Sequence, residues 1–218
     1  MAKYAVSEKT HEAIIRATGE LVAESGFTNV SIRAIAKRSG VNIGSIHYHF
    51  KSKDKLFEAL MRHVLEWMWT NHIQKAVDGL DMDTPRGRSR AVRQLVQAHL
   101  VAIMDAAKEP WYGRVVFRAM EYGSPLVDII EKEFLSKLLK VFFALYERCE
   151  PQCSAEKKYM LFHLFMGPLL MHANYPDALQ KFMGVGEFSA GYLTELEDAM
   201  TKQAQCLLGL LPDKEIEA

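Results

Sequence analysis

Apolar residues recur every three or four positions along nearly the whole chain. This spacing places side chains on one face of an α-helix, and we find no strong alternation of apolar and polar residues of the kind that indicates β-strands. The pattern therefore predicts an all-α protein. Residues 77–90 are rich in glycine, aspartate and arginine and contain a proline, so we expect a loop there. We expect helices at residues 8–25, 32–39, from 42 or 43 over about two turns, from 53 onward, and at 91–107, 111–121, 125–149, 155–172 and 187–211.

Serines and glycines mark the ends of the first helices. Ser7, Ser31 and Ser52 each precede a helical pattern and suit the N-cap position, where a side-chain oxygen accepts a backbone N–H. Gly26 and Gly40 follow the first and second patterns and suit helix ends. The first fifty residues therefore predict a compact headpiece of three short helices.

The stretch from residue 31 to residue 50 carries the most chemical information. A short helix with amide, hydroxyl, imidazole and phenol groups on its outer face suits the DNA major groove, and Gly44 lets the backbone approach a phosphate or base closely. The apolar positions close a small core with the first helix: Ile32, Ile35, Ala36, Val41, Ile46 and Phe50. The polar positions are left to face outward: Arg33, Lys37, Asn42, Ser45, His47, Tyr48 and His49.

The distribution of charge separates the headpiece from the rest of the chain. The 218 residues carry a formal net charge of zero, which by itself indicates no partner. Residues 1–55, however, hold nine Lys or Arg against five acids, a balance of +4, and the remaining residues carry −4. A basic head on a mildly acidic body is typical of a phosphate-binding module with a separate regulatory domain, although chance asymmetry gives the same numbers.

Composition also bears on the compartment. The N-terminal residues contain no apolar core of signal-peptide length, and no run approaches the roughly 18 apolar residues of a membrane span. The cysteines are sparse and odd in number: Cys149, Cys153 and Cys206. This favours a reducing cytoplasm over a disulfide framework, so we expect a cytoplasmic protein without a membrane segment.

Two runs of residues carry a family resemblance. Tyr48-His49-Phe50 ends the third helix, and Ser52-Lys53-Asp54-Lys55-Leu56 opens the fourth. Together with Ala36 and Gly40-Val41, they resemble the helix-turn-helix headpiece of the TetR family of ligand-responsive transcriptional regulators, over about residues 10–60. The resemblance implies a three-helix DNA-binding domain at residues 1–55 and a C-terminal helical bundle at residues 56–218 for ligand binding and dimerisation.

The resemblance also implies roles for individual residues of the headpiece. Tyr48, His49 and Lys53 would contact phosphates, and Lys53 lies at a helix N-terminus whose amides and dipole favour an anion. Position 47, which often carries an aromatic residue in the family, is His in this sequence. The full set of candidate DNA-binding residues is Ser31, Arg33, Asn42, Ile43, Gly44, Ser45, His47, Tyr48, His49 and Lys53.

The body is rich in residues that build adaptable apolar cavities. Residues 61–218 hold ten of the eleven methionines, eight of the eleven phenylalanines and all three tryptophans. Most of these side chains are equally explained as the filling of a helical core. The candidate ligand-binding residues are Trp67, Met68, Trp111, Phe117, Met120, Phe134 and Phe165, with Tyr112, Arg114 or Arg118 as polar contacts.

The last two helices are typical of a dimer interface. The final one carries a stripe of Leu193, Leu196, Met200, Leu207 and Leu211, and the preceding one carries Leu164, Gly167, Pro168 and Met171. Two such pairs would form a four-helix interface with twofold symmetry. The resulting hypothesis is a homodimeric regulator, a repressor that a small, largely apolar effector releases from a palindromic operator in double-stranded DNA.

Two other classes of function stay open at this point. A helical carrier of an apolar ligand with a vestigial DNA-binding head would share the body, although the basic recognition helix argues against it. An enzyme would need a catalytic constellation, and we find no glycine-rich phosphate loop and no nucleophile elbow. We therefore expect no enzymatic activity and no cofactor, and we interpret Cys149 and Cys153 as incidental thiols rather than a redox or zinc site.

Overall fold

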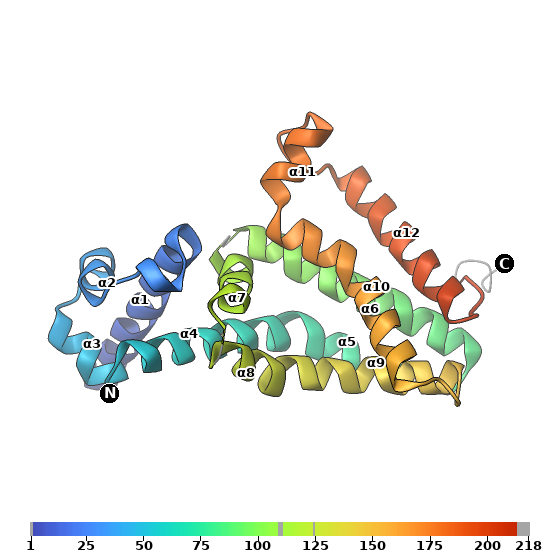
Figure 1. Ribbon diagram of the computed structural model, residues 1–218, viewed down its shortest axis with the longest axis horizontal. Coiled ribbons are helices and arrows are strands. Elements are labelled where there is room, and N and C mark those ends of the chain that lie inside the picture. Colours follow the sequence, from blue (N-terminus) through green and yellow to red (C-terminus); the bar gives the residue numbers. More distant parts are fainter. Residues whose placement is uncertain (1, 109–110, 124, 213–218) are drawn as a thin grey trace. The chain divides into compact units, whose positions relative to one another are not determined.

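The computed structural model describes residues 2–108, 111–123 and 125–212, and all regular structure within these ranges is helical (Figure 1). The predicted all-α class is thereby confirmed. The α-helices are α1 (Ala2–Ser25), α2 (Ile32–Ser39), α3 (Ile43–Phe50), α4 (Lys53–Met68), α5 (Gln74–Asp78), α6 (Pro85–Lys108), α7 (Trp111–Tyr122), α8 (Leu126–Ile130), α9 (Ser136–Cys149), α10 (Ala155–Asn174), α11 (Pro176–Met183) and α12 (Ala190–Leu207). Three other helices connect them: the 3₁₀ turn η1 (Phe27–Asn29) and the π-helical η2 (Trp69–Ile73) and η3 (Glu131–Leu135).

The described residues form two compact units. The first unit contains the chain up to Trp67 together with the segment Ala106–Leu135, and the second contains Met68–Asp105 and the residues from Ser136 onward. The first unit therefore includes α1–α3 and most of α4, and also α7 and α8. The second is built on α6, α9, α10 and α12.

The helix caps expected from the sequence are largely present in the first unit. The Ser31 hydroxyl accepts the Ala34 N–H at 3.2 Å, and the Ser52 hydroxyl accepts the Lys55 N–H at 3.1 Å. Gly40 ends α2 with a φ of 72°, a left-handed conformation that costs glycine little. The prediction for Ser7 was wrong, because α1 already begins at Ala2 and nothing between these positions breaks a helix.

The core of the first unit extends from the headpiece onto α7. Phe27 packs against Phe57 of α4 and Tyr122 of α7, with ring centroids 4.9 and 5.3 Å apart. α1 packs closely against α7 at Gly19, where an added Cβ would lie 2.2 Å from Cε3 of Trp111. Any side chain at position 19 would therefore collide with the indole ring, so the glycine is required by this contact.

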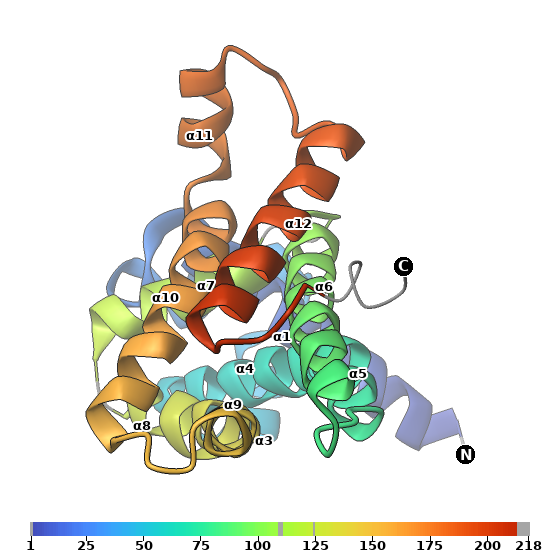
Figure 2. The ribbon, with the colours of Figure 1, turned by 90° about the vertical axis from the view of Figure 1, so that its right-hand side faces the viewer.

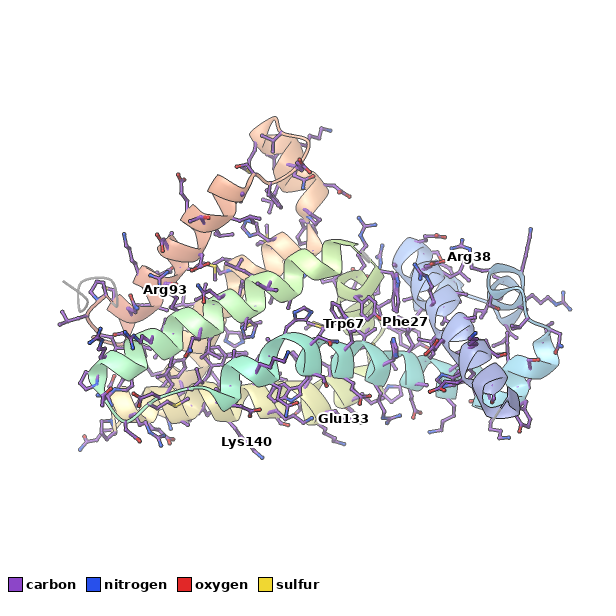
Figure 3. All side chains as sticks on the ribbon, turned by 180° about the vertical axis from the view of Figure 1, so that it is seen from behind. Phe27, Arg38, Trp67, Arg93, Glu133 and Lys140 are labelled. Carbon is purple, nitrogen blue, oxygen red and sulfur yellow. The ribbon has the colours of Figure 1, made fainter. Side chains whose placement is uncertain are left out.

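A charged cluster fastens α2 to α1. The Arg38 guanidinium donates two hydrogen bonds to the Glu24 carboxylate, at 2.9 and 3.0 Å, and a third to Glu20 at 3.3 Å (Figure 3). These carboxylates raise the pKa of Arg38, and its hydrogen bonds lower the pKa of Glu24. One of the basic residues counted in the head thus stabilises the headpiece itself.

The second unit packs α12 onto α6 and α10 (Figure 2). Arg93 of α6 donates to Glu197 at 3.2 Å and to Asp198 at 2.8 Å, both on α12. The buried Gln205 amide donates to the Ser89 carbonyl at 3.0 Å, about two turns further along α12. Polar contacts thus set the register of α12 against α6.

Several helix boundaries differ from the predicted ones. The predicted loop at residues 77–90 ends early, because α6 begins at Pro85. Proline suits the first turn of a helix, and the Thr84 hydroxyl accepts the Gly87 N–H at 2.9 Å as an N-cap. The predicted helix at residues 125–149 is divided by the π-helical η3, and the last helix spans 190–207 rather than 187–211. The short helices α5 and α11 were not predicted.

No helix in the described ranges combines the length and apolar character needed to cross a lipid bilayer.

His99 occupies the core of the second unit. Its side chain is 6% exposed and lies against the rings of Phe142 and Phe165, with centroids 6.1 and 5.6 Å away. Nδ1 is 2.6 Å from the Leu95 carbonyl oxygen. Burial lowers the pKa of His99 from 6.5 to about 4. The imidazole is therefore neutral in the folded protein near pH 7.

This pKa predicts acid sensitivity. As pH falls from 6.5 toward 4, the unfolded chain binds a proton at position 99 and the folded chain does not, so the free energy of unfolding decreases. The limiting slope is about 1.4 kcal/mol per pH unit. We expect His99→Phe to remove this slope, measured by urea unfolding across that range. His163→Phe, at an exposed position, should retain it, and equal slopes in the wild type and His99→Phe would contradict the assignment.

Candidate nucleic-acid interface and ligand cavities

Helix α3 presents most of its surface to solvent. Of its eight residues, Ile46 and Phe50 are buried, and they anchor it to the headpiece core. Tyr48 is 73% exposed and Ile43 is 41% exposed. The structure brings the candidate DNA-binding residues together on α3 and on the N-terminal ends of α2 and α4. Ser31, Arg33, Asn42, Ile43, Gly44, His47 and Tyr48 are exposed, and Ser45, His49 and Lys53 are half-buried.

Asn42 has a structural task that the sequence analysis did not assign to it. Its side-chain oxygen accepts the Ser45 N–H at 2.8 Å and the Ser45 hydroxyl at 3.1 Å, which makes it the N-cap of α3. Asparagine is among the best N-cap residues. Because that oxygen is engaged within the helix, the amide N–H groups are what Asn42 offers as donors to a DNA base or phosphate.

The other end of α3 is formed by Lys51, which was not among the candidates. Lys51 has a φ of 65°, a left-handed value that is uncommon for a residue with a side chain. Its N–H donates to the His47 carbonyl at 3.0 Å, and its ammonium group lies 5.7 Å from the centre of the Tyr48 ring. The conformation thus places an exposed cation beside Tyr48. Its position directly after Tyr48-His49-Phe50 was the available signal.

His49 is oriented toward α1. Its ring centroid is 6.0 Å from that of His11, which in turn lies 4.7 Å from Phe50. Burial lowers the pKa of His11, and its electrostatic interactions with His49 and His63 lower it further. His11 is therefore disposed to be neutral where it packs against Phe50.

Lys53 lies at the start of α4, directly after the Ser52 cap. Its ammonium group is 5.2 Å from the centre of the Phe57 ring, so the aliphatic stem follows the helix toward the core. The first N–H groups of α4 and this ammonium carry positive charge at one place. Such an arrangement suits a phosphate group.

Two of the candidate ligand-binding residues join one aromatic cluster in the first unit. Trp67 and Trp111 both pack against Tyr112, with ring centroids 4.4 and 4.0 Å away. The Tyr112 hydroxyl is 3.1 Å from Nε2 of His63, whose pKa is lowered by burial. A cleft of about 380 Å³ adjoins this cluster, lined by Lys9, Glu12, Ala13, Ile15, Arg16, His63, Trp111 and Tyr112.

The remaining candidates do not converge on this cleft. Phe117 of α7 and Phe134 of η3 are half-buried, and Met120 is 62% exposed. Met68 begins the second unit, and Phe165 lies in the interior of that unit on α10.

The second unit contains an apolar cavity that sequence reasoning missed apart from Phe165. It is small, about 20 Å³, which is room for one water molecule. Met200, which we had assigned to a dimer stripe, is 5% exposed and lines this cavity instead. The lining residues are Val92, Leu95, Phe142, Leu145, Tyr146, Leu161, Leu164, Phe165, Met200, Gln203, Ala204, Leu207 and Leu208. A helical period alone does not distinguish cavity walls from ordinary core.

The cysteines are unpaired, with Cys153 buried, Cys149 half-buried and Cys206 exposed. Burial raises the pKa of Cys149, which disfavours the reactive thiolate, although Arg88 acts in the opposite direction. Among the residues that the structure describes, no three His, Cys, Asp or Glu side chains gather as a metal site would require.

The sequence comparisons find similarity to one family of regulators. The family model described as "Bacterial regulatory proteins, tetR family" matches residues 14–60, the part of the chain that holds the helix-turn-helix. The "HTH-type transcriptional regulator BetI" of Yersinia pestis (strain Pestoides F) is 29% identical over 156 residues, which cover 72% of this chain and 76% of that protein.

Solved structures share the fold over nearly the whole length. A TetR-like transcriptional regulator from Rhodococcus sp. RHA1 superposes with a TM-score of 0.64 at 16% identity, covering 90% of this chain and 96% of that one. AibR, in a complex with isovaleryl coenzyme A and operator DNA, also gives 0.64, at 13% identity, covering 93% and 98%. Residues 14–60 thus match the helix-turn-helix of the tetR family of bacterial regulatory proteins, and the helical body beyond them shares the fold of these TetR-like regulators.

Proposed function

We propose that this protein is a homodimeric repressor that binds a palindromic operator in the cytoplasm and is released from it by a small, largely apolar effector. The observation that carries the proposal is the exposure of α3. Only Ile46 and Phe50 of its eight residues are buried, while polar groups and Ile43 face outward. A helix that contributes so little to its own core is explained by insertion into a major groove.

The proposed division of labour follows the chemistry of each side chain. Tyr48, Lys53 and the nearby Lys51 would contact phosphates, which contributes affinity for any sequence. The outward groups at the N-terminal half of α3, from Asn42 to His47, would lie near base edges and contribute specificity. Residues 1–55 would act as the DNA-binding domain, and residues 56–218 would bind the effector and dimerise.

A dimer is supported by the exposed apolar residues of α10. Met160, Leu164 and Met171 are 50%, 41% and 47% exposed, and with Gly167 they recur at the spacing of one helix face. An apolar stripe of this kind favours contact with a second copy. Two heads placed roughly 34–36 Å apart would read two half-sites on one side of the duplex.

Release would follow from unequal affinity of the effector for two conformations. An effector that binds both equally shifts nothing, so it must discriminate between them by a few kcal/mol. α4 offers a route within the first unit, because the same helix carries Lys53 at its start and Trp67 in the aromatic cluster. The complex of AibR with both an acyl coenzyme A and operator DNA supports such a ligand-responsive arrangement.

The phosphate contacts can be tested by substitution. Tyr48→Ala and Lys53→Ala should each weaken binding to all duplexes by a similar factor, and Lys53→Ala should reduce the salt slope of log K by about 1. Fluorescence anisotropy with the region upstream of the protein's own gene, at several salt concentrations, measures both. Lys140→Ala, an exposed position on α9, is the matched control (Figure 3). If the wild type binds all duplexes weakly and with the same affinity whatever their sequence, the proposed function is refuted.

The double role of Asn42 gives a sharper test. Asn42→Ala removes both the cap and the amide, so it should destabilise the protein by about 1 kcal/mol and relax base preference. Asn42→Ser keeps a capping hydroxyl, so Tm should stay near the wild-type value while base preference still relaxes. Thermal unfolding and a panel of single base-pair substitutions separate the two effects. If Asn42→Ser leaves the base preference unchanged, Asn42 is not one of the residues that contact DNA bases.

The dimer surface can be tested by charge. Met160→Glu combined with Met171→Glu places carboxylates on the exposed face of α10, where association would bury them. We expect a monomer by analytical ultracentrifugation, with operator affinity reduced at least about tenfold because one head reads too few base pairs. Val101→Glu, at a position of similar exposure on α6, should remain dimeric. A dimeric double variant would show that α10 is not the interface.

A further inference from the structure

One polar atom in the core of the second unit lacks a partner. Nδ1 of His99 faces the Leu95 carbonyl oxygen at 2.6 Å, and because a carbonyl only accepts, Nδ1 must carry the hydrogen. Nε2 is then a hydrogen-bond acceptor. It is buried and has no hydrogen-bond partner. An unpaired buried acceptor destabilises the folded state, and native proteins rarely leave one unpaired.

His99 and the apolar cavity share their walls. Val92 and Leu95, which line the cavity, lie on the same face of α6 as His99, at intervals of three and four residues. Phe142 of α9 and Phe165 of α10 also line the cavity, and both rings pack against the imidazole. The imidazole that carries the unpaired acceptor therefore packs against two aromatic side chains of the cavity wall.

We propose that His99 and this cavity form one binding site, for a neutral molecule with an apolar body and a hydroxyl or N–H group that donates to Nε2 of His99. This inference rests on the proposed function, specifies the chemistry of its effector, and places the effector in the second unit rather than at the aromatic cluster of the first. An apolar pocket with one placed polar group is the usual design of a small-molecule site. The aliphatic and aromatic walls bind the body, and His99 orients the polar end.

The charge of the site excludes other ligands. His99 is neutral near pH 7, so Nε2 has a lone pair to offer and no proton. A carboxylate would bring a second acceptor and a buried negative charge without a counterion. Ethers, ketones and hydrocarbons of the same shape would leave Nε2 unpaired.

The size of the cavity links binding to conformation. Its volume of about 20 Å³ accepts one water, so a larger guest must separate Phe142 and Phe165. The walls belong to α6, α9, α10 and α12, and α10 also carries the stripe proposed as the dimer surface. A guest would therefore favour a more open packing of these helices, which is the discrimination between states that release requires.

Probes that differ in one donor test the site. The intact protein, with ¹⁵N-labelled histidine, is titrated at pH 7 with 1-hexanol, cyclohexanol and benzyl alcohol, and then with the methyl ether and the carboxylate of each carbon skeleton. We expect at least one alcohol to shift the Nε2 resonance of His99 and to bind about tenfold more tightly than its ether, the worth of one hydrogen bond. The carboxylates should not bind.

Two variants assign the effect. His99→Phe removes the acceptor and keeps a ring, so an alcohol and its ether should then bind within about twofold of each other. His163→Phe, on the exposed side of α10, should retain the preference. The wild-type resonance decides the question even if His99→Phe does not fold. An unchanged resonance with every alcohol, or a water on Nε2 that no alcohol displaces, would overturn the site.

Anisotropy with the upstream duplex separates this inference from the function on which it rests. If the wild type binds DNA without alcohol and no alcohol shifts the Nε2 resonance of His99, the ligand site is refuted and the proposed DNA-binding function stands. An alcohol that binds at His99 and does not alter DNA affinity supports the site and refutes release through it. If an alcohol shifts the His99 resonance but the protein does not bind DNA, the proposed DNA-binding function is refuted and the ligand site stands.

Discussion

The function of this protein depends on α3 contributing only a few side chains to the core, so that most of its surface stays exposed. Two buried side chains, Ile46 and Phe50, fix the helix to the headpiece, and both of its ends are held by local hydrogen bonds at Asn42 and Lys51. Because these contacts hold the helix in place, the side chains at its other positions are not needed in the core. Their chemistry is available for recognition, and the rest of the headpiece serves to hold α3 in place.

The first unit contains α7 and α8 as well as the three helices of the headpiece. Phe27 packs against Tyr122, and Gly19 against Trp111, so α7 shares a core with residues that come ninety positions earlier. A change in the conformation of α7 would therefore be felt by α1 through direct contact. A division of the chain by sequence position alone overlooks this sharing.

The sequence predicted those features that depend on local rules. The helical period, the serine caps at 31 and 52 and the glycine end at 40 involve residues close in sequence, and they were right. The acids that engage Arg38 lie 14 and 18 positions away, and no local signal marks them. Pro85 was interpreted as part of a loop because a proline breaks a helix interior, yet at a first turn it favours a helix. The apolar cavity of the second unit combines four helices, which a period cannot foresee.

The contact between Gly19 and Trp111 has a consequence for how such a chain can evolve. Because a methyl group at position 19 would overlap the indole ring, neither position is free to drift alone. A relative that gains alanine at the first position must replace the tryptophan with a smaller residue or displace its whole helix. The residues at these two positions should therefore co-vary among relatives. Relatives with both glycine and tryptophan at these positions would have kept the same close contact between α1 and α7.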